Sequence, residues 1–291
     1  MNTVTFPGLG LTFHLDPVAF SLGDFDIYWY GIIIAFGFVL GGGFCCLQAK
    51  KFGLKPDDIL DLLLFAAPGG ILGARLYYIV FNPSLYRNAD GSWNLKACLN
   101  VHNGGLAIYG GILFGVLIAW LVARHKKIPF PALADACVFG LLIGQIAGRW
   151  GNFVNREAYG RETGLPWRMG IQETVNGVEQ TLEVHPTFLY ESLWNLVGFC
   201  LLLVILYKGL RRFDGQLFLL YVAWYGFGRG LIEGLRTDSL YFFSTGIRTS
   251  QMVGFVSFAV AAGLLLWKLS RKPDPKDLYV YQVNQTGKET T

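Results

Sequence analysis

Long apolar stretches recur along the whole of this 291-residue chain, and short polar segments separate them. The stretches run roughly over 27–48, 59–81, 105–123, 131–150, 187–207, 215–235 and 250–269. A run of about 20 apolar residues matches the hydrocarbon thickness of a bilayer, whereas shorter runs are typical of buried core helices. Because an open strand cannot satisfy its backbone groups in lipid, each run is predicted to be a helix. The pattern predicts an all-α integral membrane protein, a bundle of about seven transmembrane helices.

The composition agrees with this class. Hydrophobic residues make up 53% of the chain and charged residues only 15%, whereas a soluble chain would carry about a quarter charged residues. Glycine is frequent, with 37 copies, and runs such as Gly41-Gly42-Gly43 predict close approach of helix backbones. The five cysteines have no metal-ligand spacing, and four lie in apolar stretches, so we expect neither a metal site nor a disulfide framework.

The placement of Lys and Arg predicts the orientation. Loops after the first, third and fifth runs, together with the C-terminal tail, hold thirteen basic residues: Lys50, Lys51, Lys55, Arg124, Lys126, Lys127, Lys208, Arg211, Arg212, Lys268, Arg271, Lys272 and Lys276. The alternate loops hold seven: Arg87, Lys96, Arg156, Arg161, Arg168, Arg236 and Arg248. Because positive charge accumulates on the cytoplasmic side, the N-terminus is predicted outside and the C-terminus in the cytoplasm.

Two outer segments are long, residues 151–186 and residues 1–26, and the second is predicted to lie along the outer interface. Asn176-Gly177 lies between β-prone runs, which is a strong hairpin signal, so a small extracytoplasmic head with a β-hairpin is expected. The last dozen residues have the composition of a disordered tail. The predicted organisation is an interfacial arm at 1–26, helices at 27–150, the head at 151–186, helices at 187–270 and a cytoplasmic tail at 271–291.

Ionisable residues inside the apolar runs are the candidate site. An arginine near the centre of a membrane helix costs about 2.5–3.5 kcal/mol on insertion scales, so such residues indicate function. Under the predicted orientation, Arg75, Arg149, Arg229 and Glu191 all fall in the outer half of the membrane. If arginines outnumber the nearby acids, they leave positive charge that a phosphate could balance. Arginine is the preferred side chain for this, because its guanidinium group can donate two parallel hydrogen bonds to phosphate oxygens.

The sixth run shows the arrangement most clearly. Tyr225, Arg229, Glu233 and Arg236 lie at i, i+4, i+8 and i+11, on one helical face. The alternative interpretation is an Arg229–Glu233 ion pair that only neutralises the helix. A similar alternative applies to residues 148–157, which could be a helix C-cap with an interfacial Trp and Arg. Tyr30 could belong to an aromatic belt.

These segments carry a family resemblance. The chain resembles bacterial prolipoprotein diacylglyceryl transferases over essentially its whole length and in the same order. The matching segments are YWYG at 28–31, GARLYY at 73–78, GLAIYGG at 105–111, GRWGNFVN at 148–155, HPTFLYE at 185–191, and YGFGR at 225–229 with Glu233 and Arg236. The Gly-Arg-x-Gly-Asn-Phe-x-Asn segment is the signature of that family and is highly specific.

The resemblance implies an enzyme of the cytoplasmic (inner) membrane. It would transfer the diacylglyceryl group of phosphatidylglycerol to the thiol of a lipobox cysteine in a preprolipoprotein. A thioether would form and glycerol 1-phosphate would leave, as the first step of lipoprotein maturation. The expected partners are phosphatidylglycerol, lipobox peptides and the bilayer. No metal, organic cofactor or nucleic acid is expected.

Position by position, Arg149 and Arg229 match the essential arginines of the family. The catalytic residues are expected to be Arg149, Arg229, Tyr109, Glu191 and Asn152. The substrate-binding residues are expected to be Arg149, Tyr30, Arg75, Tyr78, Asn155, Glu157, Gly160, Tyr225, Glu233 and Arg236. Many members carry histidine where this chain has Tyr109, and a base role belongs to that histidine. The base here is therefore open between Tyr109, Glu191 and Glu157.

A lipid flippase is the rival class. A translocator needs polar lining through both halves of the membrane and often has broken helices near the midplane. Here the candidate polar residues gather in the predicted outer half, apart from Asp135. The one-sided distribution favours an enzyme that acts on a lipid at one membrane face.

Overall fold

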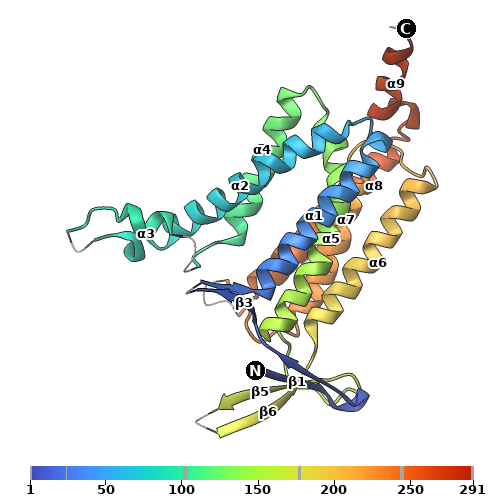
Figure 1. The fold of residues 1–291 in the computed structure, drawn as a ribbon. Helices are drawn as coiled ribbons and strands as arrows, with labels where there is room; N and C mark the ends of the chain where they lie inside the picture. Colours follow the sequence, from blue (N-terminus) through green and yellow to red (C-terminus); the bar gives the residue numbers. More distant parts are fainter. Residues whose placement is uncertain are drawn as a thin grey trace. The chain divides into compact units, whose positions relative to one another are not determined.

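The structure is a computed structural model that describes residues 2–23, 25–88, 90–100, 104–175, 178–242 and 246–289. A helix occupies each of the seven predicted ranges (Figure 1). These are α1 (Trp29–Gln48), α2 (Pro56–Phe81), α4 (Ile108–His125), α5 (Phe130–Asn155), α6 (Thr187–Tyr207), α7 (Gln216–Glu233) and α8 (Thr249–Ser270). A short helix, α3 (Leu95–Leu99), follows α2, and α9 (Tyr279–Glu289) lies near the C-terminus. The last dozen residues were expected to be disordered. This expectation is wrong for the residues up to Glu289, which belong to α9.

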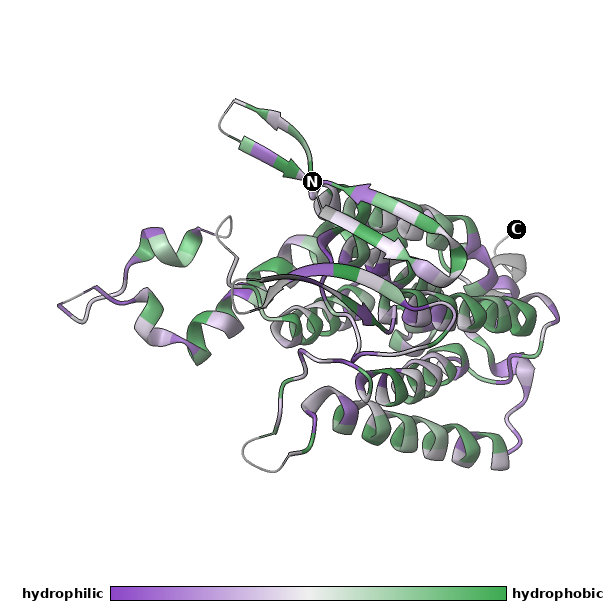
Figure 2. Cartoon of the chain, turned by 90° about the horizontal axis from the view of Figure 1, so that it is seen from below, coloured by the Kyte–Doolittle hydropathy of each residue, from purple (hydrophilic) through white to green (hydrophobic). Residues whose placement is uncertain are grey.

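Six helical segments in the described part of the chain are long and apolar enough to cross a membrane. They are Trp29–Phe52, Pro56–Phe81, Ile108–His125, Phe130–Asn155, Thr187–Tyr207 and Thr249–Ser270. Helix α7 is not among the six, because Gln216, Arg229 and Glu233 lower its mean hydropathy. Hydrophobic residues predominate along the helices in Figure 2. The chain is therefore a multi-pass membrane protein, and a crossing by α7 stays a prediction.

The predicted hairpin is present. Strands β5 (Met169–Val175) and β6 (Val178–Val184) pair antiparallel, with Met169 opposite Val184. The predicted turn at residues 176–177 lies outside the described residues.

The N-terminal arm contributes strands that the sequence did not predict. Strands β1 (Asn2–Phe6) and β2 (Leu11–Leu15) extend the hairpin to a four-stranded sheet of order β2-β1-β5-β6. Strands β3 (Val18–Leu22) and β4 (Phe25–Tyr28) form a separate two-stranded sheet. Each of these segments is at most five residues long, too short for alternation alone to distinguish a strand from a loop.

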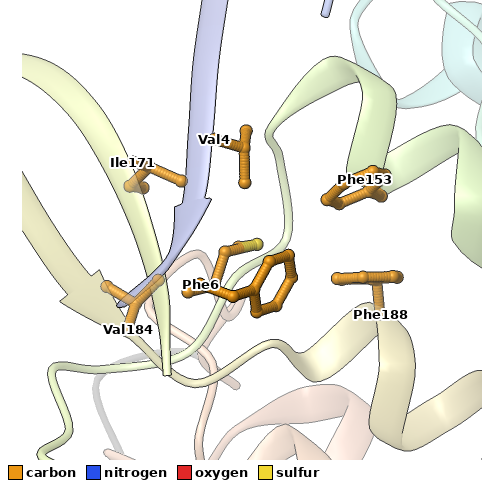
Figure 3. Packing of buried hydrophobic residues seen from close by; sticks show 7 residues of the cluster. Val4, Phe6, Phe153, Ile171, Val184 and Phe188 are labelled. Atoms are coloured by element: carbon orange, nitrogen blue, oxygen red, sulfur yellow. The ribbon is translucent and has the colours of Figure 1, made fainter. Parts of the chain in front are cut away.

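A hydrophobic core ties the four-stranded sheet to the ends of two helices (Figure 3). Val4 and Phe6, two residues apart on β1, share one face of the sheet. Phe153 near the end of α5 stacks on Phe188 at the start of α6, with ring centroids 4.6 Å apart. Burial of one such side chain is worth about 1.5–3 kcal/mol. The core fixes where the chain leaves α5 and enters α6.

The chain divides into two compact units, and each is described by itself. The first consists of Met1–Phe44 and Cys137–Leu278, and the second of Cys45–Ala136 and Tyr279–Thr291. In the second unit α2 and α4 pack through glycines, as their frequency predicted. A Cβ on Gly73 would overlap Phe114, and a Cβ on Gly110 would overlap the carbonyl of Gly73. The two helix backbones therefore touch.

Candidate active site

Three helices of the first unit bring Arg149, Glu191 and Arg229 together. The Glu191 carboxylate lies between the two arginines, with Oε2 2.6 Å from Arg149 Nη2 and Oε1 2.7 Å from Arg229 Nη1. Glu191 is 4% exposed, and both arginine side chains are mostly buried. One carboxylate therefore forms ion pairs with guanidinium groups from two other helices, and Arg229 Nη1 also donates a hydrogen bond to it.

A second carboxylate completes the cluster. Arg229 Nη2 lies 2.5 Å from Oε2 of Glu233, which is 2% exposed. Arg236 donates through Nε and Nη2 to both oxygens of Asp238, at 2.9 and 2.6 Å, and its Nη1 lies 4.0 Å from Glu191. Burial raises the pKa of the Asp238 carboxyl, but the hydrogen bonds and charge of Arg236, a backbone hydrogen bond and the charge of Arg229 together outweigh burial and hold this pKa below its usual range.

The loop after α5 is held against this cluster. Gly160 pairs with Arg236 as an isolated β-bridge, and a Cβ on Gly160 would lie 2.7 Å from Cβ of His185. Tyr159 donates to Glu173 on β5, and burial together with this hydrogen bond raises the pKa of the Tyr159 hydroxyl to about 12. Glycine is needed at 160 because two chain segments meet there.

The signature segment adds a chain of hydrogen bonds. Arg149 Nη1 donates to Asn152 Oδ1 at 3.2 Å, and Asn152 Nδ2 donates to the exposed Glu157 at 2.8 Å. A Cβ on Gly151 would overlap the ring of Tyr30, so α1 and α5 touch there. The segment is thus more than a helix cap, since it connects Arg149 to the surface. Asn155 is the last residue of α5, and its side chain makes no hydrogen bond within the described part of the chain.

The expected shortage of acids is wrong. Glu191, Glu233 and Asp238 pair with the three arginines, and Glu157 follows through Asn152. Removing one partner of a buried ion pair leaves an uncompensated charge, which is strongly destabilising. The arginines are therefore placed by carboxylates. The Arg229–Glu233 pair that was the alternative interpretation is present, but Arg229 also contacts Glu191.

In the second unit, Arg75 has a different environment. Its five N–H groups donate to five backbone carbonyls, those of Ala97, Cys98, Asn100, Gly104 and Gly105, at 2.7–2.9 Å. The side chain is also stacked over Tyr86, which packs edge-on against Tyr78. Because every donor is used, this geometry supports a role in holding the α3–α4 segment in place.

Tyr109 lies in the first turn of α4 in this second unit, and it is half-buried. Tyr225 lies in the first unit and stacks on Tyr221, with ring centroids 5.9 Å apart. The association of Arg75, Tyr78 and Tyr109 with the arginine cluster stays a prediction.

Helices α6 and α7 are joined by a reciprocal tryptophan pair that the sequence analysis missed. Trp194 Nε1 donates to the backbone carbonyl of Trp224, and Trp224 Nε1 donates to that of Trp194, both at 2.9 Å. The rings stack with centroids 4.3 Å apart. A Cβ on Gly198 or Gly228 would overlap or crowd the opposite indole. The signal was present, since each helix contains Trp-x-x-x-Gly.

This pair fixes the register of the helices that carry Glu191 and Arg229. We expect Gly228→Ala to displace Trp194, and overpacking of this kind costs about 1–3 kcal/mol. The Glu191–Arg229 contact should loosen, and kcat should fall about tenfold or more, since about 1.4 kcal/mol corresponds to a factor of ten. Thermal unfolding and steady-state kinetics would measure both effects.

Gly263→Ala is the matched control. Gly263 lies in a different helix, α8, and a Cβ there would meet no atom within 4 Å. It should leave both quantities unchanged. Wild-type kcat and thermal stability in Gly228→Ala would contradict the role assigned to the tryptophan pair.

Comparison with known proteins shows the family to which the chain belongs. The fold is that of a multi-pass membrane protein with an arginine–carboxylate cluster buried among its helices. The sequence profile of the family described as prolipoprotein diacylglyceryl transferase matches residues 17–267. The chain belongs to this family.

Curated relatives cover most of the chain. A protein of Lactiplantibacillus plantarum is 38% identical in an alignment of 282 residues that covers 94% of this chain and 94% of its own. A protein of Clostridioides difficile is 44% identical over 78% of this chain and 85% of its own. A protein of Finegoldia magna is 42% identical over 87% of this chain and 94% of its own. All three are named phosphatidylglycerol–prolipoprotein diacylglyceryl transferase.

Proposed function

We propose that this chain transfers the diacylglyceryl group of phosphatidylglycerol to the thiol of a lipobox cysteine in preprolipoproteins. The family, and the names of relatives that cover 94% of the chain, support this reaction. The observation that carries the proposal is the convergence of Arg149 and Arg229 on one buried carboxylate. Two guanidinium groups that share one carboxylate are also placed to share one phosphate.

The arginines stabilise the leaving group. As the diacylglyceryl carbon–oxygen bond breaks, charge grows on the phosphate of glycerol 1-phosphate. Donors that are already oriented in a site without water stabilise such charge most effectively. Phosphate oxygens would replace Glu191 at Arg149 Nη2 and Arg229 Nη1, since the same donors cannot serve both anions. Glu233 would keep Arg229 oriented during this exchange, because it contacts the other terminal nitrogen.

The displaced Glu191 takes the thiol proton. Thiolate is the nucleophile, so the cysteine must lose its proton before sulfur attacks carbon. One carbon–sulfur bond forms and one carbon–oxygen bond breaks. The proton passes through Glu191 to the departing phosphate. The products are the thioether-linked lipoprotein and glycerol 1-phosphate, with no oxidant or reductant consumed.

Other residues are proposed to shape the two substrate sites. Asn152 and Glu157 connect the cluster to the surface, and Gly160 lies buried in the loop that follows, where the lipobox peptide would arrive. Tyr30, which contacts Gly151, and Tyr225 would line the lipid site from α1 and α7. Tyr78, Tyr109 and Asn155 are proposed to contact substrate. Arg75 would act indirectly by holding the segment before Tyr109.

The test is an assay of purified protein with phosphatidylglycerol and a lipobox peptide. Transfer adds the mass of a diacylglyceryl group to the peptide cysteine. A cysteine-to-serine peptide is the control and should gain nothing. Movement of lipid between leaflets without any gain of peptide mass would support the flippase and reject the transferase.

We further propose seven crossings in the inner membrane, with the N-terminus outside and the C-terminus in the cytoplasm. The support is the thirteen-to-seven bias of Lys and Arg. A reporter active only in the cytoplasm is expected to work after Lys272 and to fail between residues 176 and 177. Cysteines introduced at Arg212 and Thr237, on either side of α7, should be labelled from opposite sides. Labelling of both from one side would show that α7 does not cross.

A further inference from the structure

A neutral polar layer lies one helical turn from the charged cluster. Gln145 precedes Arg149 by four residues on α5, and Asn195 follows Glu191 by four residues on α6. Residues four apart share one face of a helix. Gln145 Nε2 donates to the hydroxyl of Tyr221 on α7 at 2.8 Å. The three helices that build the cluster therefore also build this layer.

Two buried oxygens in this layer have no partner. Within the described part of the chain, neither Gln145 Oε1 nor Asn195 Oδ1 accepts a hydrogen bond, although both atoms are inaccessible. Asn195 is 1% exposed. An unsatisfied buried amide is costly, so these two side chains point to a ligand.

The chemistry of the layer differs from that of the cluster. Arginines bind phosphate, which every phospholipid contains, and cannot by themselves select one head group. Uncharged amides suit hydroxyl groups, because a hydroxyl both donates and accepts a hydrogen bond. Phosphatidylglycerol carries two hydroxyls on its head-group glycerol, directly beyond the phosphate. Under the predicted orientation Gln145 and Asn195 lie on the cytoplasmic side of Arg149 and Glu191, so the bound head group would point inward from the arginines to reach them. The pitch of an α-helix is about 5.4 Å, a distance comparable to the reach from the phosphorus to these hydroxyls.

We infer that Asn195 and Gln145 bind the hydroxyls of the head-group glycerol and thereby select phosphatidylglycerol. This inference rests on the proposed function, because it assigns a lipid to the same site. A site built to hydrogen-bond a hydroxyl discriminates strongly against an analogue that lacks it, since its own polar groups are then left unpaired. Tyr221 holds the Gln145 amide in place from α7.

The experiment compares two lipids with identical acyl chains, phosphatidylglycerol and phosphatidylpropanol, which lacks both hydroxyls. The full chain and a lipobox peptide are used, and kcat/KM is measured for each lipid. The wild type is expected to prefer phosphatidylglycerol by about tenfold or more. Asn195→Leu and Gln145→Met should each lower kcat/KM for phosphatidylglycerol about tenfold and leave that for phosphatidylpropanol unchanged.

Gln251→Met is the matched control. The Gln251 amide donates to the Gly230 carbonyl at 3.0 Å and lies outside the layer, so the wild-type preference should persist. An equal loss with both lipids would show that the layer holds only water or supports packing, and would overturn the inference. So would equal use of the two lipids by the wild type, a result that needs no variant to fold. Absence of thioether product with either lipid would instead reject the proposed function.

Discussion

Replacing Arg149 or Arg229 by lysine is expected to lower kcat/KM by about 10²-fold or more, while the chain still folds. Lysine keeps the positive charge but lacks the planar guanidinium group, whose donors can contact two oxygens at once. Arg229 reaches Glu191 and Glu233 with different nitrogens, and a single ammonium group cannot replace both contacts at this spacing. A hydrogen bond to a charged group is worth about 1.5–3 kcal/mol, and two lost bonds give at least this factor.

The measurement is steady-state transfer to a lipobox peptide by purified variants, with thermal unfolding recorded in parallel. Arg168→Lys is the matched control, since Arg168 pairs with Glu183 at 2.6 Å on the sheet, away from the cluster. Its activity should stay within about twofold of wild type, as expected for an exposed ion pair worth at most about 1 kcal/mol. Full activity of both cluster variants at normal expression would remove the arginines from the mechanism.

The helices could be predicted because lipid imposes one rule on all of them. A spanning segment must be long, apolar and internally hydrogen-bonded, so apolar length located the seven predicted helices, whereas the short α3 and the polar α9 follow no such rule. The predicted orientation also placed Arg149, Glu191 and Arg229 at one depth in the membrane, because successive spans alternate in direction. The structure brings these three side chains together. Depth could not show that Glu191 is shared, because that depends on how the helices are rotated.

The sharing of Glu191 by Arg149 and Arg229 could not be predicted, since the three residues come from segments far apart in sequence. Asp238, only two residues from Arg236, was missed because its loop carries no hydropathy signal. The carbonyls around Arg75 belong to backbone, which has no sequence signature at all. Arg75 was therefore assigned to substrate by its depth, whereas its hydrogen bonds indicate a positioning role. The strands of the N-terminal arm were missed because their pairing with β5 is long-range.

The ion pairs of the cluster also explain how three arginine side chains can be largely buried among the helices when no substrate is bound. Each guanidinium is neutralised by a carboxylate of its own or a shared one, so the helices can pack. In the proposed mechanism, binding of a phosphate would be an exchange of anions, and the carboxylate that leaves would become available as a base. This coupling would make the base appear only when the lipid phosphate is in place. Thiol deprotonation and lipid binding would thus be linked through Glu191.

Glu191→Gln is expected to lower kcat by about 10²–10⁴-fold, the usual contribution of a general base, and a selenocysteine peptide should restore much of it. A selenol is already ionised at neutral pH and needs no base. Glutamine keeps the shape of the side chain, so folding can be confirmed by thermal unfolding. Recovery with the selenium peptide separates loss of the base from general damage to the site, which would affect both peptides equally.

Tyr109→Phe provides the comparison, because Tyr109 is the rival candidate for the base that the family resemblance suggests. A tyrosine hydroxyl ordinarily titrates near 10 and a thiol near 8.5, so a neutral tyrosine is a poor acceptor for the thiol proton. We expect this variant to lose about tenfold through one hydrogen bond, equally with cysteine and selenocysteine peptides. Tyr109→His should retain part of the activity, since imidazole can make a similar bond. If the selenium peptide rescued Tyr109→Phe and left Glu191→Gln inactive, the base would be Tyr109 and the assignment to Glu191 would be wrong.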